Sequence, residues 1–106
     1  MLEERVQFMK CLADETRLAV VLLLRREQEL CVCDLVQSLG VSQPLASRHL
    51  ALLRQGDIVR ARRDGKWMHY RLSDDLAPWQ QGILDALAEA GDSVPEGAVA
   101  RSHCAA

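Results

Sequence analysis

The stretch that decides the fold is residues 38–72, which read SLGVSQPLASRHLALLRQGDIVRARRDGKWMHYRL. Gly40 is expected to close a helix that begins near Cys33, because glycine adopts the left-handed conformation that ends many helices. A second helix is expected over residues 43–55, since Pro44 suits its first turn and a glycine follows its last residue. Two helices joined by so short a turn form a helix-turn-helix.

A β-hairpin is expected to follow the second helix. Residues 58–63 and 66–72 alternate between apolar and polar side chains, and Asp64-Gly65 joins them, which is the strongest short-range hairpin signal. The side chains expected to face inward are Val59, Ala61, Met68, Tyr70 and Leu72. Those expected to face outward are Arg60, Arg62, Trp67, His69 and Arg71. A helix-turn-helix followed by a basic hairpin is the layout of a winged helix-turn-helix.

Three further helices complete the predicted fold, over residues 3–11, 14–27 and 76–90. The middle one has acids in its first turn and bases in its last, as the helix dipole favours, and it is expected to be buried. The fold class is therefore mainly α (α+β), with about five helices and a two-stranded β-hairpin wing. Residues 1–90 are expected to form one domain, and residues 91–106, which lack periodicity, a disordered tail.

Composition excludes several classes of protein. The 106 residues are 49% hydrophobic and 26% charged, which is typical of one packed domain and not of a disordered chain. The longest apolar run, residues 18–24, is far shorter than the roughly 20 residues that cross a bilayer. The N-terminal MLEERVQFMK has no apolar signal-peptide core. We therefore expect a cytoplasmic protein with no membrane partner.

The distribution of charge indicates a nucleic-acid partner. The formal net charge is −2, but residues 43–71 hold seven Lys or Arg against two Asp, which gives +5. The remainder of the chain holds six basic against thirteen acidic residues, which gives −7. A basic block attracts phosphate through its local field, whatever the total charge of the protein.

The helix predicted over residues 43–55 has two distinct faces, because successive residues lie 100° apart. The apolar face consists of Ala46, His49, Leu50 and Leu53. The outward face consists of Gln43, Ser47, Arg48, Ala51 and Gln55. Arg can pair with guanine and Gln with adenine, while Ser bonds to either base. The outward face is expected to read base edges, the alternative being an ordinary solvated face, and His49 is expected to pack inside.

The basic side chains of the hairpin are expected to bind phosphate, which supplies affinity and salt dependence but little sequence preference. They are Arg60, Arg62, Arg63 and Lys66. Trp67 is expected to pack under the hairpin or to shield its turn, not to stack on a base.

The four cysteines are Cys11, Cys31, Cys33 and Cys104. In a reducing compartment, thiols indicate metal binding, redox chemistry or packing. Cys31 and Cys33 lie at the start of the helix that ends at Gly40, where free N–H groups and the helix dipole favour thiolates. Paired thiolates suit soft ions such as trivalent arsenic or antimony, cadmium, lead, Cu(I) and zinc. On spacing alone, two buried small apolar side chains are the alternative.

The chain resembles the ArsR/SmtB family of metal-responsive repressors, and most closely its arsenic-responsive branch. The stretches that carry the resemblance span about residues 8–72 and are CLADETRLAVVLLL, ELCVCDL, VSQPLASRHLALLRQGDIV and RRDGKWMHYRL. The resemblance implies a homodimer through the first and last helices, bound to double-stranded operator DNA with an inverted repeat. It also implies As(III) or Sb(III) as inducer on Cys31 and Cys33. The DNA-binding residues that it implies are Ser42, Gln43, Ser47, Arg48, Arg62, Arg63 and Lys66.

The sequence departs from the arsenic pattern at one position, where Val36 replaces a third cysteine of that pattern. A third inducer ligand would therefore be Cys11, Cys104, a solvent thiol or none. The resemblance also bears on other metals. Cadmium- and lead-responsive relatives add cysteines from an N-terminal extension, whereas this chain starts almost at its first helix. Zinc-responsive relatives use His on the last helix, and residues 76–90 contain none.

Other functions are weighed against this interpretation. Within the same fold, a cadmium- or lead-responsive repressor or a thiol-redox sensor is the alternative. A thiol enzyme would need a nucleophile beside a base, and the sequence shows no Gly-rich loop, carboxylate pair or His–nucleophile arrangement. A module that binds proteins but not DNA, through its last helix, is the third alternative. We expect a repressor and no enzyme.

Overall fold

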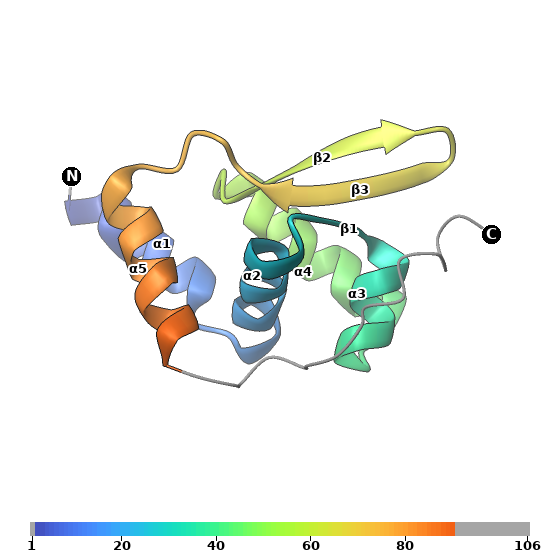
Figure 1. Cartoon of the computed structure of the whole chain (residues 1–106), viewed down its shortest axis with the longest axis horizontal. Coiled ribbons are helices and arrows are strands. Elements are labelled where there is room, and N and C mark those ends of the chain that lie inside the picture. The colour runs from blue at the N-terminus through green and yellow to red at the C-terminus, as the bar shows by residue number, and fades with distance from the viewer. Residues whose placement is uncertain (1, 91–106) are drawn as a thin grey trace.

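The structure is a computed structural model that describes residues 2–90 of the chain. Its elements are α1 (Leu2–Leu12), α2 (Glu15–Glu27), β1 (Glu29–Cys31), α3 (Val32–Leu39), α4 (Gln43–Gln55), β2 (Val59–Asp64), β3 (Trp67–Leu72) and α5 (Pro78–Glu89). The α2 helix lies in the middle, between the α1–α5 pair and the α3–α4 pair, and the β2–β3 hairpin projects beyond them (Figure 1). This is the predicted winged helix-turn-helix. The predicted tail, residues 91–106, and Cys104 lie outside the described residues.

The helix-turn-helix forms at the predicted residues, because local caps fix both sides of its turn. Gly40 ends α3 in the left-handed conformation, with φ of 67°, and its N–H donates to the carbonyl of Val36 at 2.9 Å. The hydroxyl oxygen of Ser42 accepts the N–H of Leu45 at 3.2 Å and so caps α4. The predicted bounds of the second helix, 43–55, are confirmed.

The sheet has three strands, not the two that the sequence predicts. The order is β1-β3-β2, with both pairs antiparallel, and Leu30 of β1 pairs with Tyr70 of β3. A strand of three residues is too short to show an alternating pattern. It forms because a partner 40 positions further along the chain offers an unpaired edge.

The turn of the hairpin lies one residue later than predicted. Asp64 pairs with Trp67 inside the ladder, so the loop consists of Gly65 and Lys66. Gly65 has φ of 64°, which a side chain would disfavour, and glycine at the first loop position is typical of a type II′ turn. The strand pairing shifts with the turn, but each residue keeps its side of its strand. The predicted inward face is confirmed, because Val59, Ala61, Met68, Tyr70 and Leu72 belong to the core or pack against it.

The last helix begins at Pro78, whereas the sequence predicts a start at Leu76. Proline fits the first helical position because its missing N–H would have no partner there. The side-chain oxygen of Gln80 accepts the N–H of Ala77 at 2.7 Å and closes the helix start. Leu76 is buried in the connection before the helix.

The core is built around α2, in which the five consecutive residues 20–24 are all buried. Such a run is possible only for a helix that is covered on every side, which confirms the predicted buried helix. Its start is capped by Asp14, whose carboxylate accepts the backbone N–H of Arg17 at 3.0 Å. This hydrogen bond is the main cause that lowers the pKa of Asp14. No helix within residues 2–90 is long and apolar enough to span a membrane.

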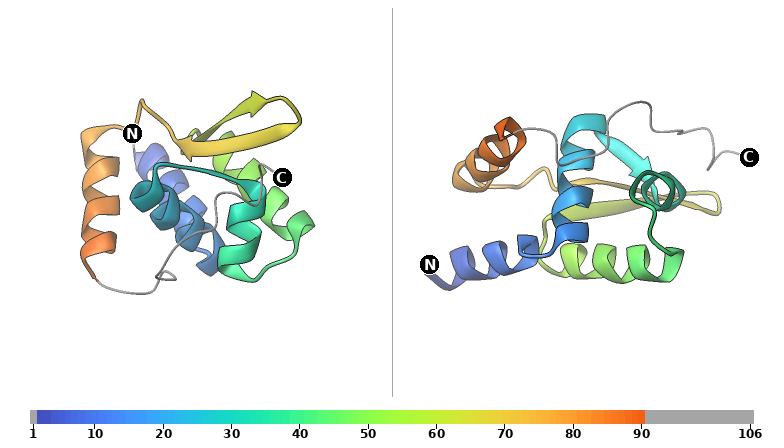
Figure 2. Two further views of the ribbon diagram at one scale, coloured as in Figure 1. Left: turned by 45° about the vertical axis from the view of Figure 1, so that its right-hand side comes forward. Right: turned by 90° about the horizontal axis from the view of Figure 1, so that it is seen from below.

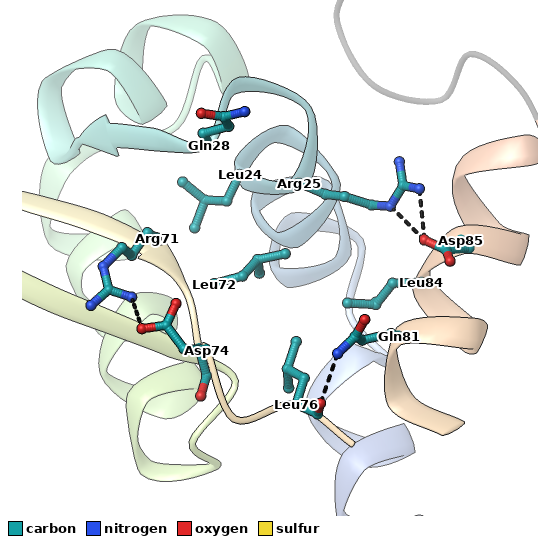
Figure 3. Close-up of a pocket in the computed structure, with 11 residues that line it drawn as sticks. Leu24, Arg25, Gln28, Arg71, Leu72, Asp74, Leu76, Gln81, Leu84 and Asp85 are labelled. Atoms are coloured by element: carbon teal, nitrogen blue, oxygen red, sulfur yellow. Dashed lines mark hydrogen bonds and ion pairs between the residues drawn. The ribbon is translucent and has the colours of Figure 1, made fainter. Parts of the chain in front are cut away.

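The α5 helix is attached to both α2 and α1. Arg25 donates two hydrogen bonds to one carboxylate oxygen of Asp85, at 3.0 and 2.6 Å (Figure 3). Phe8 of α1 packs edge-on against Trp79, with ring centroids 5.3 Å apart. A pocket of about 440 Å³ lies between α2, β3 and α5, and its apolar lining is Leu24, Leu72, Leu76 and Leu84. The α1 and α5 helices therefore contact each other through Phe8 and Trp79, on one side of α2 (Figure 2).

A close contact joins the end of α1 to the end of α4. Gly56 caps α4, and a Cβ at this position would lie 2.9 Å from the sulfur of Cys11. Its φ of −80° is one that alanine also adopts. Glycine is therefore required here by the approach of the thiol and not by the backbone conformation.

We expect Gly56→Ala to lower the free energy of unfolding by about 1–3 kcal/mol, because the added methyl group overpacks this contact. In a Cys11→Ala background the sulfur is gone, and the same change should be neutral or stabilising by about 0.4–1 kcal/mol. Urea unfolding of the four proteins measures both effects. An equal loss in the two backgrounds would contradict this reading of the contact.

Candidate functional site

The outward face of α4 is open to solvent, as predicted. Gln43, Ser47 and Arg48 are exposed, whereas Ala46, Leu50 and Leu53 on the opposite face are buried. Ser42 is also exposed at the start of the helix, and its hydroxyl hydrogen stays available as a donor while the oxygen caps α4. The first turns of α4 thus present small and polar side chains of the kind that reach base edges.

His49 lies on the inner side of α4, as predicted from its position on the apolar face. Its side chain is 12% exposed, and its Nδ1 lies 3.2 Å from Nη1 of Arg17 on α2. Its Nε2 lies 3.8 Å from the carboxylate of Asp14. The sequence pattern did not single out Arg17, whose partners lie on three different segments.

Most cations on the outer face of the sheet are already paired. Arg62 donates two hydrogen bonds to the carboxylate of Glu29, at 3.0 and 2.8 Å. This pairing lowers the pKa of Glu29. Arg60 pairs with Asp75 at 2.5 Å, and Arg71 pairs with an acid on the loop that follows β3. The charge that the hairpin offers to phosphate is therefore smaller than its sequence suggests.

Two of the predicted phosphate-binding residues, unlike Arg62, have no acidic partner among residues 2–90. Among residues 2–90, neither Arg63 nor Lys66 forms an ion pair, and both are exposed near the tip of the hairpin. The ammonium of Lys66 lies 5.4 Å from the ring centroid of Trp67, a cation–π contact that leaves its donors free. Trp67 is half-buried, and Lys66 of the turn lies over its ring.

The two cysteines of the predicted metal site lie where the sheet passes into the helix-turn-helix. Cys31 is the last residue of β1 and the N-cap of α3, with an extended backbone (φ −88°, ψ 169°). Cys33 is a free cysteine in the first turn of α3 and is half-buried. Two cysteines separated by one residue can point the same way only where the backbone is extended or just entering a helix, as it is here.

The carboxylate of Asp34 lies beside the sulfur of Cys31. Asp34 is 2% exposed, and its Oδ2 accepts the N–H of Cys31 at 3.3 Å and lies 3.4 Å from the sulfur of Cys31. Its Oδ1 has no hydrogen-bond partner among residues 2–90. The capping position explains why an acid occurs here. The sequence pattern did not single out Asp34, because a lone acidic residue near a helix start is common.

Within residues 2–90, the third cysteine lies far from this site. Cys11 packs against Gly56 at the far end of α4, and Cys104 lies outside the structure described. Within residues 2–90, no three His, Cys, Asp or Glu side chains are grouped so that they could hold a metal ion. Within residues 2–90, the cysteines at this junction are therefore Cys31 and Cys33.

The chain matches one family model and several known proteins. The model is that of "Bacterial regulatory protein, arsR family", over residues 14–61. The chain is 55% identical over 80 residues to the "Arsenical resistance operon repressor" of Escherichia coli K12, covering 76% of this chain and 68% of that protein. It is 48% identical over 81 residues to the "Arsenic resistance transcriptional regulator ArsR1" of Pseudomonas putida, covering 76% and 63%.

Solved structures agree with these sequence matches. HlyU from Vibrio cholerae superposes with a TM-score of 0.74 at 30% identity, covering 83% of this chain and 91% of that one. The "AntR antimony-specific transcriptional repressor" superposes with a TM-score of 0.71 at 34% identity, covering 84% and 80%.

We expect Glu29→Gln to strengthen binding to duplex DNA and to steepen its salt dependence by up to about one phosphate contact, because it releases Arg62. Lys66→Ala should lower the same slope by about one contact for every DNA sequence. Binding is measured by fluorescence anisotropy over a range of salt concentrations. The control is Glu29→Gln in an Arg62→Ala background, where the steepening should vanish. An unchanged gain there would mean that Glu29 acts only through its own charge.

Proposed function

Because the chain belongs to the arsR family of bacterial regulatory proteins and is a winged-helix transcriptional repressor, we propose that As(III) or Sb(III), bound at Cys31 and Cys33, releases it from operator DNA. The observation that carries the proposal is the place of the two cysteines. They lie at the junction from which the sheet leads in one direction and the helix-turn-helix in the other. The arsenic and antimony repressors among its relatives support this class of inducer.

The chemistry of the two donors fits such an inducer. Trivalent arsenic and antimony are soft, and thiolate sulfur is the ligand that soft ions prefer in proteins. When bound, the ion would join the two cysteines, which lie on either side of Val32, into one rigid ring. Asp34 supplies only hard oxygens, so we assign it to the cap of α3 and not to the inducer.

An inducer bound at this junction would act on elements that contact the DNA-reading surface directly. The α3 helix packs against α4, so a change in the first turn of α3 alters the support of the reading helix. Cys31 also pairs with His69 of β3, which leads directly to the tip of the hairpin. Two parts of the DNA-binding surface therefore depend on the backbone at one residue. A coupling free energy of about 1–3 kcal/mol is typical of such effects.

The experiment is an operator-release titration on fully reduced protein with arsenite, antimonite, cadmium, lead and zinc in parallel. Cys31→Ser and Cys33→Ser should each keep operator affinity within about twofold, because neither belongs to the reading surface. Each should lose release by arsenite and antimonite, since a hydroxyl is a poor ligand for soft ions. Matched controls are Cys11→Ser and Cys104→Ser, which should still respond.

Four outcomes would contradict the proposal. Release of either serine variant at wild-type arsenite concentrations would exclude that cysteine as a ligand. Loss of response in Cys11→Ser or Cys104→Ser would identify a third protein sulfur. Release by cadmium or lead but not by arsenite or antimonite would show that the inducer is another metal. Release by mild oxidants alone would indicate a redox sensor.

We also propose that the repressor is a homodimer through α1 and α5. The α1 helix has an apolar stripe that nothing in residues 2–90 covers: Leu2, Val6 and Met9 are 71%, 42% and 50% exposed. Their spacing of four and three residues places them on one face. The α5 helix lies beside α1 through the Phe8–Trp79 contact. A second copy would cover this stripe, and a two-fold dimer matches an inverted repeat.

We expect Val6→Glu to convert the dimer into a monomer that remains folded, because it places a charge in the centre of the stripe without touching the core. Affinity for an inverted-repeat operator should fall at least tenfold. Sedimentation velocity and circular dichroism measure assembly and folding. Gln7→Glu adds the same charge beside the stripe and should remain dimeric. A dimeric Val6→Glu protein would show that the interface lies elsewhere.

A further inference from the structure

One side chain links the end of α1 to the reading helix. Arg17, in the first turn of α2, donates from Nε to the carbonyl of Cys11 at 2.7 Å and from Nη2 to the carbonyl of Lys10 at 3.4 Å. The last carbonyls of a helix have no partner within it, so the guanidinium satisfies groups that α1 cannot satisfy itself. From the same position it reaches α4, where its Nη1 lies 3.2 Å from Nδ1 of His49.

The chemistry of this contact determines the hydrogen-bonding role of Nδ1 of His49. A guanidinium has donors only, so Nδ1 of His49 must accept the hydrogen bond from Arg17. Nε2 of the same ring faces the carboxylate of Asp14 at 3.8 Å. Asp14 in turn accepts the backbone N–H of Arg17 at 3.0 Å. The imidazole therefore lies between the guanidinium of Arg17 and the carboxylate of Asp14.

A second contact holds α4 at its other end. The Cys11 sulfur packs against Gly56, so the end of α1 meets α4 both near its middle, through Arg17, and at its last turn. Figure 2 shows α1 and α4 following one another almost in line along one edge of the molecule. The joint between the two helices is made by the Arg17–His49 contact and the Cys11–Gly56 contact.

We propose that Arg17 and His49 are positioning residues for DNA recognition, which set the half-site spacing that the repressor accepts. The proposal rests on the proposed function, in which α1 forms part of the dimer interface and α4 reads the major groove. A dimer bound to two half-sites about one helical turn apart must hold its reading helices at a matching separation. The joint between α1 and α4 transmits the position of the interface to each reading helix.

The base-reading side chains are separate from this joint. Gln43, Ser47 and Arg48 are exposed, whereas His49 points the other way, into the protein. Loosening the joint should therefore change the tolerance for spacing and leave the preferred bases within each half-site as they are. A role in stability alone would not produce this separation of effects.

The experiment starts with full-length wild-type protein and a random duplex library, from which the preferred inverted repeat is selected. Duplexes whose spacer differs by one or two base pairs in either direction are then compared. The wild type should prefer its own spacing at least tenfold. His49→Leu and Arg17→Met should reduce this preference to less than threefold, with the selected half-site bases unchanged. All binding is measured well below the thermal midpoint of each variant.

Two further variants make the test specific. His49→Asn keeps an acceptor near the position of Nδ1 and should retain the spacing preference within twofold. Arg48→Ala, one residue away on the outer face, should alter the preferred bases and keep the spacing preference. Full spacing preference in His49→Leu, or equal loss in His49→Leu and His49→Asn, would overturn the positioning role. Selection of no inverted repeat by the wild-type protein would overturn the dimeric mode of DNA binding, and the positioning role with it.

Discussion

The burial of α2 on all sides is the constraint on which the rest of the structure depends. Five consecutive apolar residues, 20–24, can be removed from water only if other elements cover every face of the helix. The α1 helix, α3, α4 and the sheet all contact it, and α5 is tied to it through Arg25 and Asp85. The polar and charged side chains of these covering elements are left outside, where they form the DNA-binding surface.

This arrangement places the proposed inducer site at a junction between the sheet and the helix-turn-helix. Cys31 ends the strand that pairs with β3 and is the N-cap of the helix that packs against α4, so one residue joins the sheet to the helix-turn-helix. Arg17 contacts the middle of α4 through His49, and Cys11 contacts its last turn at Gly56. In the proposed function, the reading helix is therefore supported by α3, which begins at the inducer site, and by the end of α1, which takes part in the dimer.

Most of the fold could be predicted because its signals are local. Gly40, Pro44 and Gly65 mark the ends of elements through their own backbone preferences, and the structure confirms the helix-turn-helix and the hairpin. The strand β1 could not be predicted, since three residues show no period and its partner lies 40 positions away. The Arg62–Glu29 pair and the contacts of Arg17 were missed for the same reason. The roles proposed for Cys31 and Cys33 as inducer ligands rest on family resemblance and on the chemistry of thiols.

The central claim is that inducer binding at Cys31 and Cys33 and operator binding oppose one another through the fold. Thermodynamic linkage requires that the operator weaken arsenite binding by the same factor by which arsenite weakens operator binding. The most direct measurement is the arsenite affinity of the reduced repressor, free and saturated with operator, by isothermal titration calorimetry. The account predicts weaker binding to the operator complex, by the factor found in operator-release titrations. Equal arsenite affinity with and without operator DNA would contradict it.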